Sequence, residues 1–222
     1  TLVTSLGSVM LPRVAHLLST GEQKAVNKMH EMSFLIYNLV IFPIIAGMLI
    51  VNDDFVQFFL GQDFQDARYA IAIMIFRMFF IGWTNIMGIQ ILIPHNRNKE
   101  FMISTTAPAI ISVGLNLLFL PKLGYIGAAI VSVLTEALVW AIQLFFTRRY
   151  LKDVPIIGSM MKIILASAIM YGLLLGSKTV IHFPPTLNVI IFAVLGGIIY
   201  LFAILSLKVI NVKELKQLIR KN

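Results

Sequence analysis

The sequence lacks cysteine altogether and contains few charged residues. Because none of its 222 residues carries a thiol, it cannot form a disulfide framework, an iron–sulfur cluster, a thiolate zinc site or a cysteine nucleophile. Charged residues make up 13% of the chain and hydrophobic residues 59%. Ordinary soluble domains contain about 25% charged residues. This composition excludes a soluble globular enzyme.

Long apolar stretches take the place of the missing charge. A membrane-spanning helix needs roughly 20 mostly apolar residues, and six stretches meet this, at about 32–51, 69–93, 101–120, 125–147, 160–181 and 187–208. They are far longer than the strands of about ten residues found in outer-membrane barrels. The sequence therefore predicts an all-α, polytopic helical membrane protein with about six transmembrane helices plus the end of a preceding one. Pro43 and Pro108 are expected to kink their helices without ending them.

The connections between the predicted spans are alternately rich and poor in basic residues. Four places hold 14 of the 18 basic residues: the segment before the first span and the segments after the second, fourth and sixth spans. The intervening connections hold one each, and the first of them, 52–68, is rich in aspartate. Because basic loops stay in the cytoplasm, we expect a multi-pass protein of the bacterial cytoplasmic membrane with a cytoplasmic C-terminus.

The chain begins with Thr1 inside an apolar run that ends near Leu18, without the pattern of a signal peptide. We expect it to be the C-terminal portion of a longer transporter, with the N-terminal half of that transporter as its partner. Residues 1–151 would then be part of the C-terminal transporter lobe. Residues 152–222 would form two additional transmembrane helices and a basic amphipathic cytoplasmic tail.

Two ionisable residues fall well inside the predicted spans. Arg77 lies within 69–93, and Glu136 lies near the middle of 125–147. A charge at the bilayer centre costs at least about 2.5–3.5 kcal/mol on insertion scales, so such residues usually face a protein interior or a water-filled cavity. Both are therefore candidates for a transport pathway.

Further polar residues share helix faces with these two or occupy the span between them. At helical spacing, three neighbouring spans each carry one polar stripe. Such stripes can converge on a hydrated cavity near the bilayer midplane, where transporters bind their substrates. The predicted substrate-pathway residues are Arg77, Thr84, Ser112, Asn116, Glu136, Trp140 and Gln143.

A structural interpretation of the same residues stays open. Arg77 and Glu136 would then simply neutralise each other. Asn116 and Gln143 would make interhelical hydrogen bonds of about 1 kcal/mol that position the helices.

The sequence contains no HExxH motif, no P-loop and no Ser–His–Asp set at one depth of the membrane. Its four histidines, His16, His30, His95 and His182, are expected in or beside loops on different sides of the membrane. They would therefore be unable to share one metal ion. We predict no enzymatic activity, no cofactor and no metal site.

The last two spans carry almost no strong polar residues but several glycines, among them Gly172, Gly176, Gly196 and Gly197. Small residues four apart let helices approach closely, and a groove for a lipid tail is the alternative interpretation. Residues 209–219 place apolar side chains at helical spacing among basic ones, which is typical of a helix on an anionic membrane surface.

Four short segments occur in order along the first 150 residues. They are 5–13 (SLGSVMLPR), 59–64 (FLGQDF), 88–94 (GIQILIP) and 116–129 (NLLFLPKLGYIGAA), the last running on to Thr135 and Glu136. Their order and spacing resemble the Wzx-type oligosaccharide flippases, the polysaccharide transporter branch of the multidrug/oligosaccharidyl-lipid/polysaccharide superfamily.

This resemblance implies two six-helix lobes with alternating access, commonly followed by two further helices. Members of the family carry undecaprenyl-diphosphate-linked oligosaccharides to the outer face of the membrane for capsule, exopolysaccharide or related polymers. The implied partners are the lipid-linked oligosaccharide, membrane lipids and polymer-assembly proteins. A cation such as Arg77 would suit the diphosphate of this substrate.

Two other functions stay open at this point. An ion-coupled multidrug exporter of the same superfamily should carry several carboxylates and few cations in its cavity, and this chain offers one of each. A non-transporting membrane scaffold for polymer assembly would use the basic loops as its contact surface. Nucleic-acid binding is not expected, because the net charge of +8 lies where membrane topology requires it.

Overall fold

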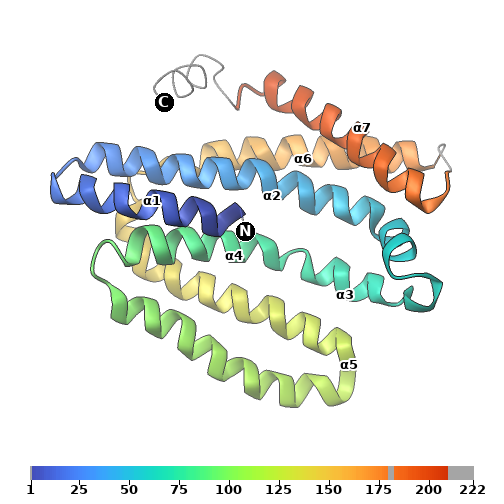
Figure 1. Cartoon of the computed structure of the whole chain (residues 1–222), viewed down its shortest axis with the longest axis horizontal. Coiled ribbons are helices and arrows are strands. Elements are labelled where there is room, and N and C mark those ends of the chain that lie inside the picture. The colour runs from blue at the N-terminus through green and yellow to red at the C-terminus, as the bar shows by residue number, and fades with distance from the viewer. Residues whose placement is uncertain (1, 180–182, 210–222) are drawn as a thin grey trace. The chain divides into compact units, whose positions relative to one another are not determined.

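The computed structural model describes residues 2–179 and 183–209, with side chains from residue 10 onward. Within these ranges the chain is helical, and it contains no strand (Figure 1). The elements are α1 (Leu2–Ser19), α2 (Gln23–Phe59), the 3-10 helix η1 (Gln62–Phe64), α3 (Ala67–Met74), α4 (Arg77–Asn85), the π-helix η2 (Ile86–Leu92), α5 (Asn98–Leu151), α6 (Ile156–Lys178) and α7 (Pro185–Ser206).

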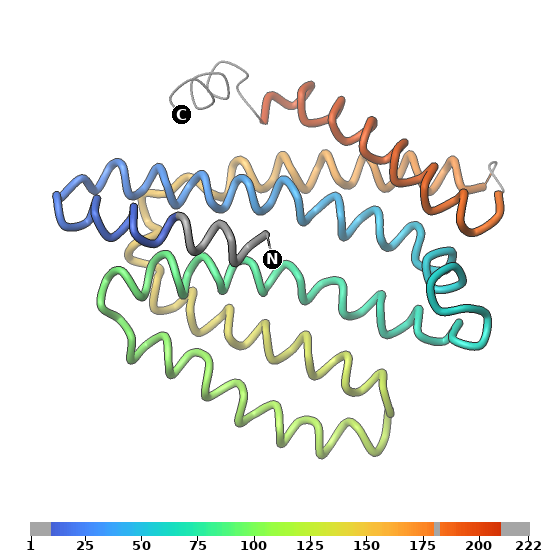
Figure 2. The backbone as a smooth tube through the Cα atoms, in the orientation of Figure 1, coloured from blue at the N-terminus to red at the C-terminus, as the bar shows by residue number. Residues whose placement is uncertain are grey.

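Five helical stretches in the described ranges are long and apolar enough to cross a membrane. The longest, α5, has 54 residues and contains a non-helical residue, Gly124, at which its direction reverses. Its two halves run antiparallel (Figure 2), and they account for the predicted spans 101–120 and 125–147. The prediction of an all-α polytopic membrane protein is confirmed. Pro43 and Pro108 lie inside α2 and α5, as the sequence predicts.

The reversal in α5 depends on two glycines. Gly124 has a φ of +55°, a left-handed conformation that residues with a side chain rarely adopt. At Gly127, a Cβ atom would lie 2.6 Å from the carbonyl oxygen of Phe119. The chain therefore turns here because neither position carries a side chain.

α2 is longer than the predicted span 32–51. It begins at Gln23 and ends at Phe59, so that much of the predicted acidic loop 52–68 is helical. A helix of 37 residues is about 55 Å long at a rise of 1.5 Å per residue. Hydrocarbon is roughly 30 Å thick, so polar residues at both ends of α2 can stay helical without entering it.

The predicted span 69–93 is not one uniform helix. It is divided into α3, α4 and η2, with a break in the α-helix at Ile75 and Phe76. In η2 the backbone bonding is wider than in an α-helix, since the N–H of Ile93 donates to the carbonyl of Gly88 at 3.1 Å. Such π-helical turns are rare and occur frequently at functional sites.

The helices pack into two compact units. Unit 1 contains α1, α2 as far as Asn38, and α3 to α5. Its core includes Phe34, Trp83 and Met87. Unit 2 contains the rest of α2 from Leu39, then η1, α6 and α7, with Ile163 and Phe192 in its core. The functional division expected at residue 151 stays a prediction, because a packing unit need not coincide with a functional lobe.

Large apolar side chains cover the outer surfaces of these helices. Leu117 in α5 is 73% exposed, Ile157 in α6 is 73% exposed, and Phe202 in α7 is 75% exposed. Exposure of this kind is expected where lipid rather than water surrounds a protein. The predicted amphipathic tail, 209–219, lies outside the described residues apart from Val209.

Candidate functional site

Arg77 and Glu136 form an ion pair inside unit 1. Arg77 is the first residue of α4, and Glu136 lies in the second half of α5. An Nη atom of Arg77 lies 2.9 Å from a carboxylate oxygen of Glu136. The Glu136 side chain is 19% exposed and the Arg77 side chain 38%. Two residues singled out separately from the sequence are thus brought into direct contact.

The break between α3 and α4 positions Arg77. The backbone bonds there are of the tighter i to i−3 type, with the N–H of Met78 donating to the carbonyl of Ile75 at 3.2 Å. The pair leaves part of the guanidinium unused. Its Nε atom is enclosed and has no hydrogen-bond partner in the described part of the chain.

Glu136 also lines a pocket of about 380 Å³ in unit 1. The walls come from α4, η2 and both halves of α5. Its lining includes Thr84, Thr105, Thr135, Glu136 and Gln143. Ligand pockets in proteins measure about 300–1,000 Å³, so this one has room for a small polar group. Three predicted pathway residues, Thr84, Glu136 and Gln143, therefore share one pocket, and Arg77 adjoins it through Glu136.

The threonines of this pocket direct their hydroxyl protons back to their own helices. Thr84 donates to the carbonyl of Ile81 at 3.0 Å, and Thr135 donates to that of Val131 at 2.7 Å. Thr105 donates to the carbonyl of Phe101 at 3.1 Å. Among the described residues, the hydrogen-bond donor of Glu136 is Arg77. The carboxylate is consequently held by one partner.

Gln143 joins the two halves of α5 at the base of the site. Its amide donates to the hydroxyl of Ser104 at 3.3 Å, and both side chains are buried. Gly88 of η2 packs against them, since a Cβ there would lie 3.1 Å from Nε2 of Gln143 and 2.6 Å from the ring of Phe101. These contacts fix the hairpin against the π-helix.

The structure places the other three predicted residues outside the lining of this pocket. Ser112 donates to the carbonyl of Ala109 at 2.8 Å, and Asn116 donates to that of Ser112 at 2.9 Å, so both bond within their own helix. Trp140 belongs to an aromatic cluster, with ring centroids 5.8 Å from Phe80 and 6.3 Å from Trp83.

A second buried polar cluster in unit 1 was not predicted. His30, Ser33 and Gln90 are each 1% exposed. The hydroxyl of Ser33 donates to the side-chain oxygen of Gln90 at 2.7 Å. Asn38, also 1% exposed, accepts from the indole N–H of Trp83 at 2.9 Å. The polar residues of α2 follow helical spacing, which is the signal in the sequence that could have revealed this face.

The expectation that His30 lies in or beside a loop is wrong. His30 is inside α2, and its Nε2 lies 3.2 Å from the backbone carbonyl of Gln90. In the π-helix η2 that carbonyl would accept from residue 95, but the N–H of His95 donates to Ile91 at 3.3 Å. The α-helical donor would be residue 94, and Pro94 has no N–H. Since a carbonyl can only accept, the proton of the imidazole lies on Nε2. His30 therefore supplies the donor that Pro94 cannot provide.

His95 lies in the connection between η2 and α5. Its ring centroid is 4.0 Å from that of Tyr150, and its Nδ1 lies 2.7 Å from the carbonyl of Ile91. Burial lowers the pKa of His95, and the positive charges of Arg149 and Arg97 lower it further, against the opposing effect of the Ile91 carbonyl. In the described ranges no three His, Asp or Glu side chains are placed to share a metal ion.

Unit 2 contains an apolar pocket of about 450 Å³ between α2, α6 and α7. Gly47, Gly196 and Gly197 are part of its lining. Gly196 permits a close approach to α6, because a Cβ there would lie 3.1 Å from a methyl group of Leu174. The predicted close packing at Gly172 and Gly176 is not observed among the described atoms, since a Cβ at either position would meet nothing within 4 Å.

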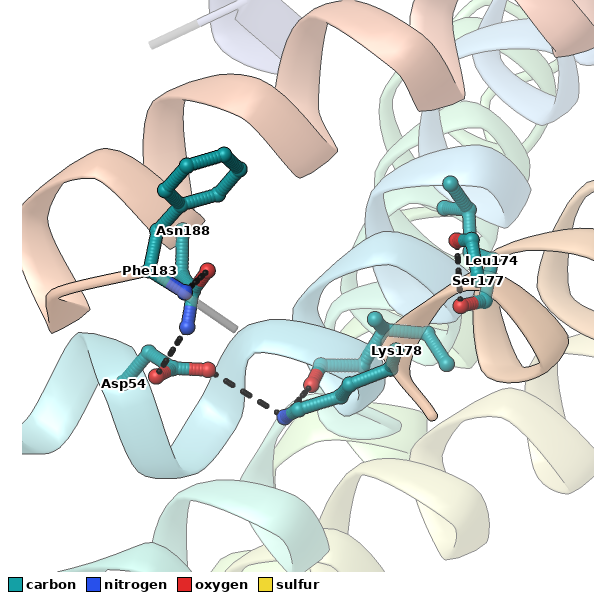
Figure 3. A network of polar contacts seen from close by, with 7 residues as sticks. Asp54, Leu174, Ser177, Lys178, Phe183 and Asn188 are labelled. Atoms are coloured by element: carbon teal, nitrogen blue, oxygen red, sulfur yellow. Dashed lines mark hydrogen bonds and ion pairs between the residues drawn. The ribbon is translucent and has the colours of Figure 1, made fainter. Parts of the chain in front are cut away.

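A polar network ties the helices of unit 2 together (Figure 3). Nζ of Lys178 lies 3.2 Å from a carboxylate oxygen of Asp54 and donates to the carbonyl of Ile50 at 2.7 Å. The other oxygen of Asp54 accepts from the amide of Asn188 at 3.0 Å. Asn188 in turn accepts from the N–H of Phe183 at 3.2 Å. One carboxylate thus connects α2 with the end of α6 and the start of α7.

Comparison with known proteins places these features in a family. The sequence pattern of the family described as lipid II flippase MurJ matches residues 1–216. The uncharacterized membrane protein MJ1068 of Methanocaldococcus jannaschii is 27% identical over 221 residues, which are 98% of this chain and 42% of that protein.

Two further relatives have names that describe transport. The probable low-salt glycan biosynthesis flippase Agl15 of Haloferax volcanii is 22% identical over 97% of this chain and 46% of its own length. The putative O-antigen transporter of Escherichia coli is 26% identical over 66% of this chain and 35% of its own. The chain spans less than half the length of each of these relatives. Because the family pattern covers nearly the whole chain, this protein belongs to the lipid II flippase MurJ family.

Proposed function

We propose that this chain is part of a flippase that moves undecaprenyl-diphosphate-linked oligosaccharide repeat units across the bacterial cytoplasmic membrane for cell-surface polysaccharide synthesis. The observation that carries the proposal is the Arg77–Glu136 ion pair at the edge of a pocket with polar and apolar walls, within a helical unit whose outer surface is apolar. A charged pair in such a place fits a pathway for a charged cargo. Its membership of a flippase family and the names of two relatives support the same conclusion.

The guanidinium of Arg77 suits the diphosphate of the proposed cargo. A guanidinium is planar, stays charged at physiological pH and matches a phosphate with two parallel hydrogen bonds. Arg77 uses one Nη atom on Glu136 and leaves Nε without a partner among the described residues. The proposed step breaks and forms no covalent bond, so we assign neither catalytic residues nor a cofactor.

The apolar pocket of unit 2 suits a lipid tail. Its walls are apolar side chains and glycines, and exchanging lipid tails for a polyprenyl tail there requires no polar partner. In this proposal residues 1–151 belong to the transporting lobe. Residues 152–222 add two helices, and the C-terminus faces the cytoplasm as the distribution of basic loops requires.

The test is the sidedness of the lipid-linked glycan pool. Cells depleted of the natural gene product would be treated intact with a glycan-modifying enzyme that cannot cross the membrane. We expect the unmodified inner pool to accumulate, and wild-type protein but not Arg77→Ala to restore modification. Lys28→Ala is the matched control, because Lys28 also forms an ion pair, with Glu31, but is 61% exposed. An outer pool that is unchanged by depletion would contradict the proposal.

A further inference from the structure

The Arg77–Glu136 pair has unequal partners. Arg77 is twice as exposed as Glu136, at 38% against 19%. It also keeps an enclosed Nε atom for which the described chain offers no acceptor. A guanidinium held by one carboxylate oxygen through one Nη atom has not used the two-pronged face that it presents to oxyanions. The hydrogen-bonding capacity of Arg77 is therefore only partly used in this structure.

Glu136 has the opposite character. It faces the pocket, but the hydroxyl protons of Thr84, Thr105 and Thr135 are directed at backbone carbonyls of their own helices. The amide of Gln143 is directed at Ser104. A carboxylate that left Arg77 would find none of these four donors free without breaking a bond inside a helix or the hairpin. The hydrogen-bond partner that the described residues give it is Arg77.

From this asymmetry we propose that Glu136 is an internal placeholder for the cargo's phosphate on Arg77. Two oxygens of a diphosphate that enters beside Arg77 pair with two of its N–H groups, including the one that Glu136 now accepts from, and thereby displace Glu136. The displaced carboxylate then competes for the same guanidinium and promotes release of the phosphate. This inference rests on the proposed function, since it concerns how the head group is bound and let go.

The placeholder role predicts effects of opposite sign for the two partners. A structural ion pair would lose the same interaction whichever partner is removed. A placeholder behaves differently, because removing Glu136 frees Arg77 for the ligand. Glu136→Gln should therefore strengthen phosphate binding and slow transport, whereas Arg77→Ala should weaken binding.

The experiment uses the natural gene product in detergent with undecaprenyl diphosphate as the probe. We expect Glu136→Gln to lower Kd about two- to fivefold, the range of one partly exposed ion pair. Arg77→Ala should raise Kd about tenfold or more. The double variant should bind like Arg77→Ala, since without Arg77 the carboxylate has nothing to block. Flipping by reconstituted Glu136→Gln should be slower than by the wild type.

Glu100→Gln is the matched control. Glu100 pairs with Arg97 at the same distance of 2.9 Å and with a similar exposure of 20%. Freeing Arg97 should leave Kd unchanged. If Glu136→Gln does not fold, Glu136→Asp is the second variant. Its shorter side chain weakens the ion pair with Arg77, so it should also lower Kd.

Equal or weaker binding by a folded Glu136 variant would overturn the placeholder role while leaving the proposed function intact. A wild-type protein that does not bind undecaprenyl diphosphate would instead count against the proposed function. A Kd lowered equally by Glu100→Gln would also overturn the inference, because the effect would then come from charge alone.

Discussion

The interiors of the two units differ in polarity. The buried polar residues of unit 1 lie on α2, α4, η2 and α5, and include His30, Gln90 and Gln143. The interior of unit 2 is mainly apolar. Its described polar contacts between helices include the network around Asp54 and a bond from the Tyr200 hydroxyl to the carbonyl of Leu39 at 2.8 Å. A polar interior fixes the register of its helices and can hold a hydrated group, whereas apolar packing can exchange contacts with lipid.

The largest expected effect tests whether apolar packing stabilises unit 2. Phe192 is 2% exposed in unit 2. Replacing it with alanine should lower the free energy of unfolding by about 3–5 kcal/mol, because the cavity left behind loses its contacts. A denaturant titration in detergent micelles measures this. Phe202→Ala on the same helix is the control, since Phe202 is 75% exposed, and equal effects of the two would refute the prediction.

In unit 1 the corresponding test removes a hydrogen bond and not a contact surface. His30→Leu leaves the Gln90 carbonyl without its donor and should cost about 1–3 kcal/mol in the free energy of unfolding. Pro94→Ala restores a backbone N–H nearby, so His30→Leu should cost less in that background. The same titration measures both. An identical cost in the two backgrounds would show that Pro94 is not the reason for the histidine.

The polar network of unit 2 should contribute less. Lys178→Met leaves Asp54, which is 14% exposed, without its counter-charge, but Lys178 itself is 32% exposed. We expect a loss of about 1–2 kcal/mol in the free energy of unfolding, since partial exposure limits what an ion pair contributes. Adding Asp54→Asn should recover part of the loss. If the double variant is as unstable as the sum of the single variants, the two residues are not coupled.

The smallest effect is a dependence on pH. Because the pKa of His95 is lowered in the folded state, the unfolded chain binds a proton more readily and stability falls as the pH drops below about 6.5. His95→Gln should reduce the difference in unfolding midpoint between pH 7.5 and pH 5.5. His16→Gln is the control, since His16 is exposed. No change with His95→Gln would contradict the lowered pKa.

Hydropathy was sufficient to predict most of the fold. Apolar length is a direct requirement of the bilayer, and it located the helices, including the reversal of α5 between two predicted spans. It could not show that the span 69–93 breaks at Ile75 and Phe76 or widens into η2. Both features depend on backbone bonding that tertiary partners complete, as His30 does for Gln90.

The candidate site was predictable only in part. Charges inside apolar spans are conspicuous, so Arg77 and Glu136 could be singled out, and the structure brings them together. Ser112 and Asn116 satisfy their side chains within one helix, and spacing alone cannot separate that from lining a cavity. Ser33 and Gln90 escaped notice because an uncharged polar residue in a helix gives a weak signal until its partner is known.

The contact between His30 and Gln90 has an evolutionary consequence. A proline at position 94 is tolerable because a side chain from another helix replaces the donor that proline lacks. The two positions are therefore epistatic: exchanging the histidine first is harmful, whereas exchanging the proline first makes the histidine dispensable. Descendants of this sequence should lose Pro94 before they lose His30, and an ancestor should have gained them in the reverse order.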